Sequence, residues 1–209
     1  MDSCLVGSEM CIRDRAGRHL NQMREATEQF GLGMIGLGFD PLWKREDIPW
    51  MPKGRYRIMR NYMPKVGTMG LDMMQRTCTI QVNLDYATEI DMVRKFRVSL
   101  ALQPVATALF ANSPFRERQS TGLLSTRAEV WTDTDPHRSG VPDCVFDENF
   151  GYEQWVDYIL DVPMYFLHHG VGYEDVAGLS FLDFMAGKLP GHEGLLPTMT
   201  DWSLSLIHI

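Results

Sequence analysis

Polar and apolar residues alternate without a break over positions 77–86, and this pattern restricts the fold of the chain more than any other. The polar positions are Thr77, Thr79, Gln81, Asn83 and Asp85, and the apolar ones are Cys78, Ile80, Val82, Leu84 and Tyr86. A period of two predicts a β-strand with one buried face. The other face carries short hydrogen-bonding side chains where a solvated strand usually carries Lys, Glu or Arg. It is therefore either an ordinary exposed face or a wall that binds a polar ligand.

Helical patterns surround this predicted strand. Residues 16–30 predict a helix that Gly31 ends. Residues 88–91 resemble a capping box and open a second helix, which Pro104 is expected to kink or restart before the breaker at 112–114. The apolar stripe of that helix is predicted to be Ile90, Val93, Phe96 and Leu100. Further helices are predicted over 151–160 and over 180–186, the last closed by Gly187.

Shorter β signals occupy the second half of the chain. Residues 130–132 predict a short strand between a loop at 116–122 and a turn at 133–136. Residues 162–167 and 173–176 predict a hairpin across 170–172. Residues 31–70, rich in Gly and Pro, are expected to form a long irregular segment. Because separate helices are mixed with antiparallel-style strands, the predicted fold class is α+β.

Composition excludes several classes of protein. The 209 residues are 44% hydrophobic and 22% charged, which suits a globular domain with a real core. A net charge of −7 opposes general nucleic-acid binding, and no apolar run approaches the ~20 residues of a membrane span. The cysteines at 4, 11, 78 and 144 lack zinc-finger spacing and are interpreted as reduced thiols of a cytosolic protein.

The two ends of the chain fit no structural or targeting pattern. Residues 1–15 lack the apolar core of a secretion signal and carry acidic residues that a transit peptide avoids. Residues 204–209 interrupt a helix that begins at 200–202. Both ends are interpreted as non-native tails of the kind that translated adapter sequence produces. Residues 16–203 are then expected to be a fragment of one domain.

Four further motifs each have a functional and an ordinary interpretation. Gly31–Gly36 matches GxGxxG, but a helix is expected before it, so flexible loop glycines are favoured over a dinucleotide site. A basic cluster is either a solvated surface or an anion site. It consists of Arg55, Arg57, Arg60 and Lys65. For Asp133 and Asp135, an Asx turn is favoured over a metal site. His168 and His169 would point to opposite faces of a strand, so a surface position is favoured over a shared metal.

Several long strings closely resemble the plant and proteobacterial type of glutamate–cysteine ligase. They are MPKGRYRIMRNYMPKVGTMGLDMMQRTCTIQVNLDY (51–86), RKFRVSLALQPVATALFANSPF (94–115), STRAEVWTDTDPHRSG (125–140), WVDYILDVPMYF (155–166) and DFMAGKLP (183–190). The resemblance runs from about residue 20 to residue 202. It implies a glutamine-synthetase-like fold, in which a partial curved antiparallel sheet carries helices on its outer face.

The resemblance also implies a reaction and its participants. Glutamate, cysteine and ATP, with Mg²⁺, would give γ-glutamylcysteine through an acyl phosphate, which is the first step of glutathione synthesis. No nucleic-acid or membrane partner is implied, and the oligomeric state stays open. Two alternatives also stay open: a sister ligase that joins glutamate to another amine, and a non-catalytic domain that binds an amino acid or a nucleotide.

Residue roles follow from the same resemblance. Arg127 and Arg138 are the catalytic candidates, because they could pair with phosphate or with a substrate carboxylate. The residues implied to bind substrate are Met74, Arg76, Thr77, Cys78, Asn83, Asn112 and Ser113. The residues implied to bind the cofactor are Arg57, Arg60 and Gln81, of which Gln81 is also a weak metal ligand. Trp131 is expected to serve packing.

Two departures from the family pattern carry expectations of their own. The Glu-rich metal-binding segment and the RYLExR-type strand of the family are not found here, so the chain alone is expected to be inactive. The regulatory cysteine pair of plant members corresponds to Val176 and Gly191. The resemblance therefore implies no redox switch and a bacterial, cytoplasmic parent.

Overall fold

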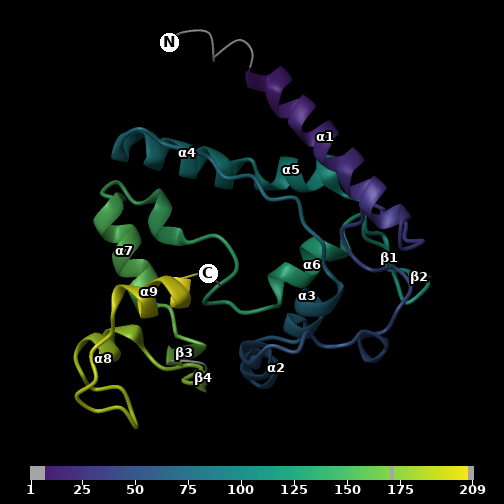
Figure 1. The fold of residues 1–209 in the computed structure, drawn as a ribbon. Coiled ribbons are helices and arrows are strands. Elements are labelled where there is room, and N and C mark those ends of the chain that lie inside the picture. Colours follow the sequence, from purple (N-terminus) through teal and green to yellow (C-terminus); the bar gives the residue numbers. More distant parts are fainter. Residues whose placement is uncertain (1–7, 170–171, 207–209) are drawn as a thin grey trace. The chain divides into compact units, whose positions relative to one another are not determined.

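The computed structural model describes residues 8–169 and 172–206 and separates into two compact units, 1–36 and 37–209 (Figure 1). The first unit contains helix α1 (Ser8–Glu28). This confirms the helix predicted at 16–30, although α1 begins at Ser8, inside the range interpreted as a tail. The helix ends where Gly31 adopts a left-handed φ of 65° and donates its amide to the Glu28 carbonyl. Residues 31–36 follow a helix and are irregular, as the loop interpretation of the glycines requires.

The second unit begins with a short 3-10 helix and an α-helix where an irregular segment was expected. A short 3-10 helix, η1 (Arg45–Asp47), precedes α2 (Gly54–Val66) and α3 (Gly70–Arg76). The prediction for 31–70 is therefore wrong over α2. Ile58, Met59 and Met63 of α2 are buried on one side, and this packing outweighs Pro64, which lies in the last turn of the helix. The bends and turns on either side of α2 account for the rest of the Gly and Pro content.

Residues 77–86 do not form the predicted strand. After an isolated bridge between Phe39 and Thr77 the segment is irregular. Ile80, Val82, Leu84 and Tyr86 are 82%, 73%, 59% and 54% exposed. A strand is stable only when a neighbour pairs its backbone. Within the described residues, no backbone amide of 79–86 donates to another backbone carbonyl. We refer to residues 79–86 as the alternating segment.

Two consecutive helices follow the alternating segment, α4 (Glu89–Ala101) and α5 (Gln103–Phe110). The predicted cap is confirmed, because Thr88 Oγ1 accepts the Asp91 amide at 3.2 Å. Pro104 lies in the first turn of α5, so it restarts the helix rather than kinking it. Most of the predicted buried stripe is confirmed: Leu100 is buried and Val93 and Phe96 are partly buried, whereas Ile90 is exposed and Met92 is buried in addition.

The middle of the chain also differs from the prediction. The loop expected at 116–122 contains a tight hairpin of β1 (Phe115–Arg116) and β2 (Gln119–Ser120), turned by Glu117 and Arg118 at φ 52° and 68°. The strand predicted at 130–132 belongs to helix α6 (Thr126–Thr132). Ser125 caps this helix, because its Oγ accepts the Ala128 amide. The strand was predicted because Val130 and Thr132 are β-branched. A 3-10 helix, η2 (Asp143–Phe146), follows.

The last third of the chain folds largely as predicted. Helix α7 (Tyr152–Asp161) leads into β3 (Phe166–His169), which pairs antiparallel with β4 (Gly172–Asp175). Helix α8 (Phe181–Met185) is capped by Ser180 and followed by Gly187 at φ 68°. Helix α9 (Met199–Leu206) continues into the expected C-terminal tail. The α+β class is confirmed, but the strands of the described residues form two separate two-stranded sheets and not one curved sheet.

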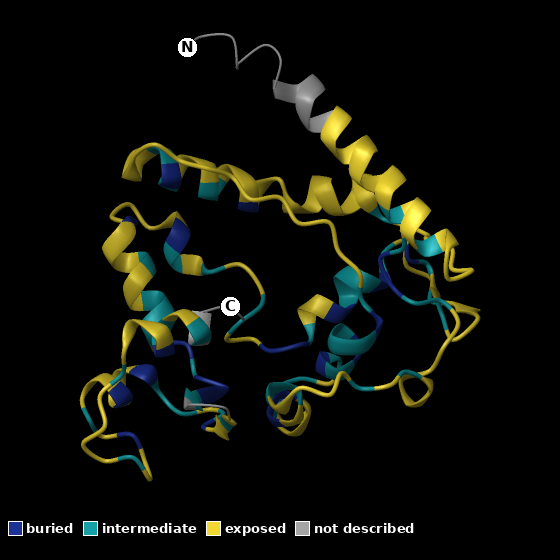
Figure 2. Cartoon of the chain, viewed as in Figure 1, coloured by how far each residue is buried: buried dark blue, intermediate teal, exposed yellow. Residues whose placement is uncertain are grey.

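In the described part of the second unit, buried hydrophobic residues form three clusters, and Figure 2 shows buried residues in dark blue near α2, β3 and α8, where two of these clusters lie. One joins α2 to the β3–β4 hairpin through Met63, Tyr165 and Phe166. Another gathers around Phe184 and Leu189, and the third around Val145 and Phe150. No helix within residues 8–169 and 172–206 is long and apolar enough to cross a membrane.

Candidate functional site

The polar cluster around Arg127 brings together several predicted site residues. Arg127 lies on α6, where its Nε donates to the Cys78 carbonyl at 2.7 Å and its Nη2 to Thr79 Oγ1 at 2.8 Å. Its backbone amide donates to Ser113 Oγ at 3.2 Å. Two bonds to one guanidinium fix its orientation, and Nη1 makes no hydrogen bond to any described residue. A planar donor held in this way suits a carboxylate or a phosphate oxygen.

Gly38 forms the floor of the Arg127 cluster. Its carbonyl accepts the Cys78 amide at 3.0 Å. A Cβ atom at this position would lie 2.7 Å from Asn112 Oδ1 and 3.2 Å from Ser113 Oγ. A larger residue at this position would displace the side chains of Asn112 and Ser113. The structure thus brings Cys78, Asn112, Ser113 and Arg127 to one place, with Thr77 next to Cys78.

Arg138 belongs to a different, buried network. Its guanidinium lies 4.1 Å above the centre of the Tyr165 ring and donates to the Pro163 carbonyl. The Tyr165 hydroxyl donates to Asp135 Oδ2 at 2.6 Å, and Tyr62 packs edge-on against Tyr165. Burial lowers the pKa of Arg138 and raises the pKa of Tyr165, and the Asp135 carboxylate raises the latter further. The two catalytic candidates, Arg127 and Arg138, thus have separate surroundings.

Arg76 has its donors taken up by protein groups. Its Nε donates to Asp72 Oδ1 at 2.7 Å, and its Nη1 donates to the Trp43 carbonyl and pairs with Glu117 at 3.0 Å. Its guanidinium also lies 4.9 Å from the centre of the Phe39 ring. The residue is buried, so the geometry gives Arg76 a role in holding the first part of the second unit together. Its implied contact with substrate stays a prediction.

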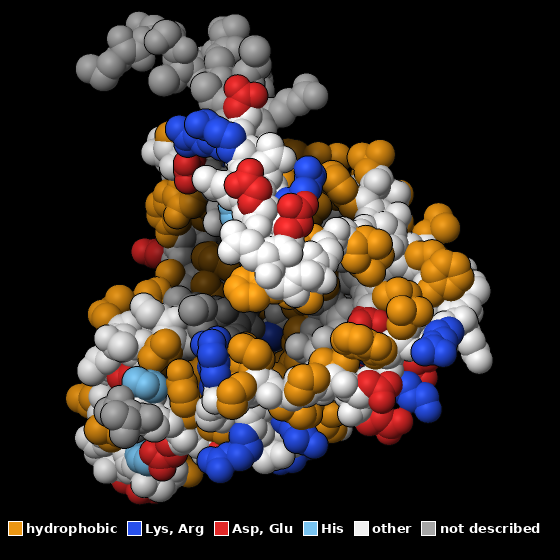
Figure 3. Space-filling model, turned by 45° about the vertical axis from the view of Figure 1, so that its right-hand side comes forward, with side chains coloured by type: hydrophobic (Ala, Val, Ile, Leu, Met, Phe, Trp, Pro, Cys, Tyr) orange, Lys and Arg blue, Asp and Glu red, His pale blue; other side chains and the backbone are white. Residues whose placement is uncertain are grey.

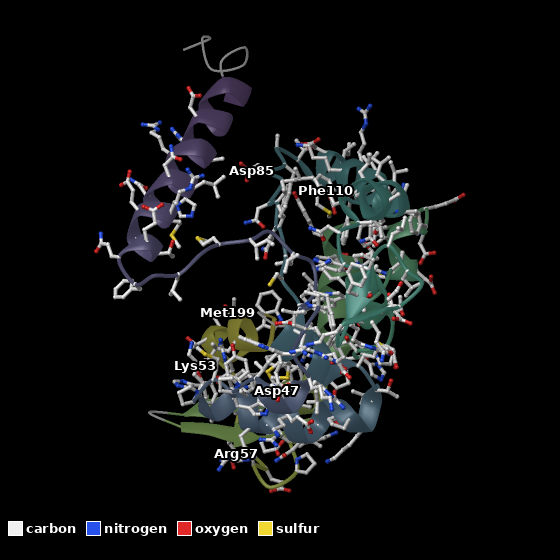
Figure 4. The ribbon with its side chains drawn as sticks, turned by 90° about the vertical axis from the view of Figure 1, so that its right-hand side faces the viewer. Asp47, Lys53, Arg57, Asp85, Phe110 and Met199 are labelled. Atoms are coloured by element: carbon white, nitrogen blue, oxygen red, sulfur yellow. The ribbon has the colours of Figure 1, made fainter. Side chains whose placement is uncertain are left out.

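The other predicted residues are dispersed. Met74 packs against the α2 hydrophobic cluster. Gln81 and Asn83 are exposed on the alternating segment, where Gln81 Nε2 donates to Asn83 Oδ1 at 3.1 Å. Arg57 and Arg60 are exposed on α2, and Figure 4 shows Arg57 at the opposite end of the ribbon from Asp85 and Phe110.

The described residues do not fit a Mg²⁺ ion. No group of three His, Cys, Asp or Glu side chains suitable for a metal occurs in the part of the chain that the structure describes. Asp133 and Asp135, the two aspartates that could bind a metal, instead form hydrogen bonds within the protein. Asp133 binds Thr68 through both carboxylate oxygens. Asp135 Oδ1 accepts the His137 amide at 3.0 Å, which is the expected Asx turn. His168 contacts the Tyr173 ring, while the side chain of His169 lies outside the described residues.

Sequence reasoning missed three contributors to these sites. Gly38 was one glycine among several, and only the nearness of Asn112 distinguishes it. Tyr165 lay in a predicted strand, where nothing in the local sequence marks a hydroxyl that reaches Asp135 thirty positions earlier. Trp50 stacks on Arg60, and an aromatic residue near a basic cluster was the available signal.

An oriented arginine beside an amide and a hydroxyl, in an α+β unit, is an arrangement that suits proteins of the class that binds small anionic molecules. The comparison with known proteins narrows this class. The chain belongs to the glutamate–cysteine ligase family 2 (GCS2), which matches residues 11–202. The resemblance stated from the sequence strings is therefore confirmed.

The most similar relatives include three plant proteins. The chloroplastic glutamate–cysteine ligases of Brassica juncea and Arabidopsis thaliana are each 60% identical to this chain over 191 residues. Glutamate–cysteine ligase B of Oryza sativa subsp. japonica, also chloroplastic, has the same identity. Each match covers 91% of this chain but only 37%, 37% and 38% of the respective relatives. The chain thus spans little more than a third of their length.

These relatives overturn one expectation. A bacterial, cytoplasmic parent was inferred because Val176 and Gly191 replace a cysteine pair of plant members. The proteins that match at 58–60% identity are nevertheless plant enzymes whose names describe them as chloroplastic. The expectation is therefore wrong, because two substituted positions carry less information than the identity of the whole matched region.

Proposed function

We propose that this chain forms part of an enzyme that ligates glutamate to cysteine at the expense of ATP, in the first step of glutathione synthesis. Family membership supports the ligase class, and the orientation of Arg127 is the observation that carries the proposal. The guanidinium is held by two bonds to residues 78 and 79, and it keeps Nη1 for an anionic group. Asn112 and Ser113 border the same place with an amide and a hydroxyl.

The proposed reaction has two steps. An oxygen of the glutamate γ-carboxylate bonds to the γ-phosphorus of ATP, and ADP leaves. The cysteine nitrogen then bonds to the acyl carbon, inorganic phosphate leaves with the C–O electron pair, and the nitrogen loses a proton. Negative charge moves between the carboxylate, phosphoryl and leaving oxygens as these bonds form and break, and a guanidinium fixed where charge builds up in the transition state lowers the barrier without reorganising. We assign this task to Arg127, and we assign hydrogen bonds to the amino-acid substrate to Asn112 and Ser113.

The glutamine-synthetase-like sheet is also part of the proposal. The alternating segment would enter that sheet with its polar face, which includes Gln81 and Asn83, towards the substrates. The described residues offer no group of ligands for Mg²⁺. For the same reason, we expect the purified chain alone to form no γ-glutamylcysteine from glutamate, cysteine and Mg-ATP, as chromatography of the products would detect.

A chimaera tests the proposed function directly. Residues 11–202 of this chain would replace the corresponding region of the Brassica juncea ligase. We expect the chimaera to form γ-glutamylcysteine only when glutamate, cysteine and ATP are all present. Competition between cysteine and other amines would identify the acceptor. A chimaera that folds, as judged by circular dichroism, but does not ligate would overturn the proposal.

Arg127 is tested within the chimaera. Arg127→Lys keeps the charge but loses the planar fork, and we expect kcat/KM to fall about 10- to 100-fold, the range of a lost charged hydrogen bond. Arg94→Lys is the matched control, because Arg94 is exposed on α4 and lies outside the cluster. Equal activity of the two variants would remove Arg127 from the proposed mechanism.

A further inference from the structure

Helix α5 carries no charge and is exposed along its whole length. No charged residue occurs from Val98 to Phe115, although 22% of the chain is charged. All eight residues of α5 are exposed, and Leu109 and Phe110 are 75% and 70% exposed. A helix without charged residues is normally buried, because the exposure of apolar side chains to water is unfavourable. The composition of α5 therefore disagrees with its surroundings in this chain.

This disagreement distinguishes α5 from the helices near it in the sequence. Figure 3 shows hydrophobic side chains open to view over much of the face that it displays, so exposure alone is not unusual. The helices α2, α4 and α8, however, each bury residues in a hydrophobic cluster, such as Met63, Leu100 and Phe184. No residue of α5 belongs to any of the three clusters that the described residues form.

The apolar side chains of α5 lie on more than one side of the helix. Leu102, Val105 and Leu109 follow one another at spacings of three and four and form one row. Val98 extends this row, because the Leu102 amide donates to the Val98 carbonyl at 3.0 Å and so continues the helix from α4. Phe110 lies about 100° round the helix from Leu109. A contact on one side of α5 would therefore leave part of its apolar surface in water.

Three kinds of occupant could cover such a surface. A membrane is excluded, because eight helical residues extend about 12 Å and a span needs about 20 residues. A second copy of the chain would cover one side, since a symmetric contact pairs the same patch of both chains. The third occupant is further polypeptide of the same protein. This chain covers only 37% of the Brassica juncea ligase, so the greater part of that relative lies outside the matched region.

We propose that α5 is a core helix of the complete protein, and that polypeptide outside the matched region packs on Val105, Leu109 and Phe110. The occupant presents an apolar surface, because α5 has no charged group with which a charge could pair. The inference rests on family membership and on the exposure of α5, and it does not depend on the reaction.

The packing of α5 has a consequence for the Arg127 cluster. Helix α5 ends at Phe110, and Asn112 and Ser113 follow directly. Ser113 is buried, and its amide donates to the Leu124 carbonyl at 3.1 Å. A covered α5 would hold the residues before Ser113 as well, Asn112 among them. This consequence rests on the proposed function, whereas the packing of α5 does not.

Hydroxyl-radical footprinting read by mass spectrometry measures the exposure of Phe110 in the chain and in the chimaera described above. We expect labelling of Phe110 to be about fivefold slower or more in the chimaera, because labelling follows accessible area and Phe110 starts at 70% exposed. Equal labelling in the two proteins would overturn the inference. Protection that the chain alone gains with concentration, or that the chimaera loses on dilution, would assign α5 to a second copy and would also overturn it.

A variant tests the same contact by its effect on stability. Leu109→Asn nearly keeps the size of the side chain and adds an amide. We expect the melting temperature of the chain to change by less than about 1 °C, because Leu109 is exposed there. In the chimaera it should fall by about 3 °C or more, because an unpaired amide is costly in an apolar contact. Equal shifts in the two proteins would contradict the proposed packing.

Leu182→Asn is the matched control. Leu182 is an exposed leucine on α8, a helix that already buries Phe181 and Phe184, so its shift should be the same in both proteins. If the Leu109→Asn chimaera does not fold, footprinting of the unsubstituted chimaera decides. A folded but inactive chimaera with a protected Phe110 would reject the proposed ligase function and leave this inference standing. Ligation by a chimaera in which Phe110 is labelled as fast as in the chain would do the reverse.

Discussion

Each oxygen of the buried Asp135 carboxylate accepts a hydrogen bond from a neighbouring residue. Asp135 is 2% exposed, and its oxygens accept from the His137 amide and the Tyr165 hydroxyl. The Tyr165 ring in turn carries the Arg138 guanidinium on its face. A buried ionised group is tolerated only when its hydrogen bonds are made. This network therefore stabilises the connection between the turn after α6 and the start of β3.

Tyr165→Phe removes one bond from this network. We expect the free energy of unfolding to fall by about 1–3 kcal/mol, because Asp135 Oδ2 loses its donor in a buried place. Urea denaturation followed by circular dichroism measures the change. Tyr152→Phe serves as the control, since Tyr152 is exposed and its hydroxyl makes no hydrogen bond to a described residue. A similar urea midpoint for both variants would contradict the importance of the network.

Two surface carboxylates predict how stability depends on pH. The Lys95 ammonium holds the pKa of Asp91 below its ordinary value of 3.8, and hydrogen bonds from Thr68 lower the pKa of Asp133 in the same way. A lowered native pKa means that the stabilisation is complete above about pH 4. It is then lost as the pH falls through the native pKa values.

This acid dependence can be measured by urea denaturation at pH 6 and at pH 3. We expect a lower midpoint at pH 3, and a smaller difference between the two pH values in Asp133→Asn, which no longer titrates. Asp161→Asn is the control, because Asp161 is exposed and makes no ion pair within the described residues. If Asp133→Asn kept the full acid dependence, the contact with Thr68 would not be its source.

At the scale of elements, α2 and α3 are fixed to the end of α6 by a backbone contact. Gly67, between the two helices, lies so close to the carbonyls of Asp133 and Thr134 that a Cβ atom would be 2.7 Å from the first and nearer still to the second. The Met69 amide donates to the Asp133 carbonyl at 2.9 Å. The joint between the helices therefore has no room for a side chain.

Gly67→Ala should separate these elements. We expect a loss of about 1–3 kcal/mol in unfolding free energy, the usual cost of overpacking, because carbonyl groups cannot rotate away as a side chain would. Thermal melting followed by circular dichroism is sufficient to detect it. Gly33→Ala, where a Cβ would meet nothing within 4 Å, should melt like the parent. An unchanged melting temperature for Gly67→Ala would mean that the joint adapts.

The elements that the sequence predicted correctly are those defined by local signals. Thr88 and Ser180 cap helices, Gly31 and Gly187 end them, and each acts on residues within one turn. The strand predicted over 77–86 is not formed, because this segment has no neighbouring strand to pair with among the described residues. Helix α6 was not predicted, because its β-branched residues are typical of a strand and the cap at Ser125 was overlooked.

Part of the candidate site could also be predicted from the sequence. Residue type and resemblance were enough to select Arg127, Asn112 and Ser113, which the structure brings together. Nothing in the sequence places Gly38 beside Asn112, because that contact joins positions more than seventy residues apart. The burial of Arg76 was equally hidden, since it depends on Glu117, another distant residue.

At the scale of the whole molecule, exposed apolar side chains occur along much of the chain, and two runs of them lie on the alternating segment and on α5. The alternating segment exposes Ile80, Val82 and Leu84, and α5 exposes Leu109 and Phe110. Exposed apolar side chains beside unpaired backbone groups favour association between chains. This surface is expected to dominate the behaviour of the purified chain in solution.

Val82→Lys should weaken that association. We expect about a tenfold change in the association constant, equivalent to about 1.4 kcal/mol, because a charge replaces an apolar side chain on the exposed row. Sedimentation velocity over a range of concentrations measures it. Asn83→Lys adds the same charge to the polar row and should have a smaller effect. Equal effects would indicate that net charge alone, rather than the apolar row, controls association.

Oxidation of the methionines in the α2 cluster can report how often this core opens to solvent. Met63 is 2% exposed and would lie against any side chain at Gly70, whereas Met199 on α9 is 70% exposed. Peroxide converts a thioether to a polar sulfoxide wherever it can reach the sulfur. Met199 should therefore oxidise at once, while oxidation of Met63 waits for the cluster to open. The ratio of the two rates, read by mass spectrometry, reports how often this core is exposed to solvent.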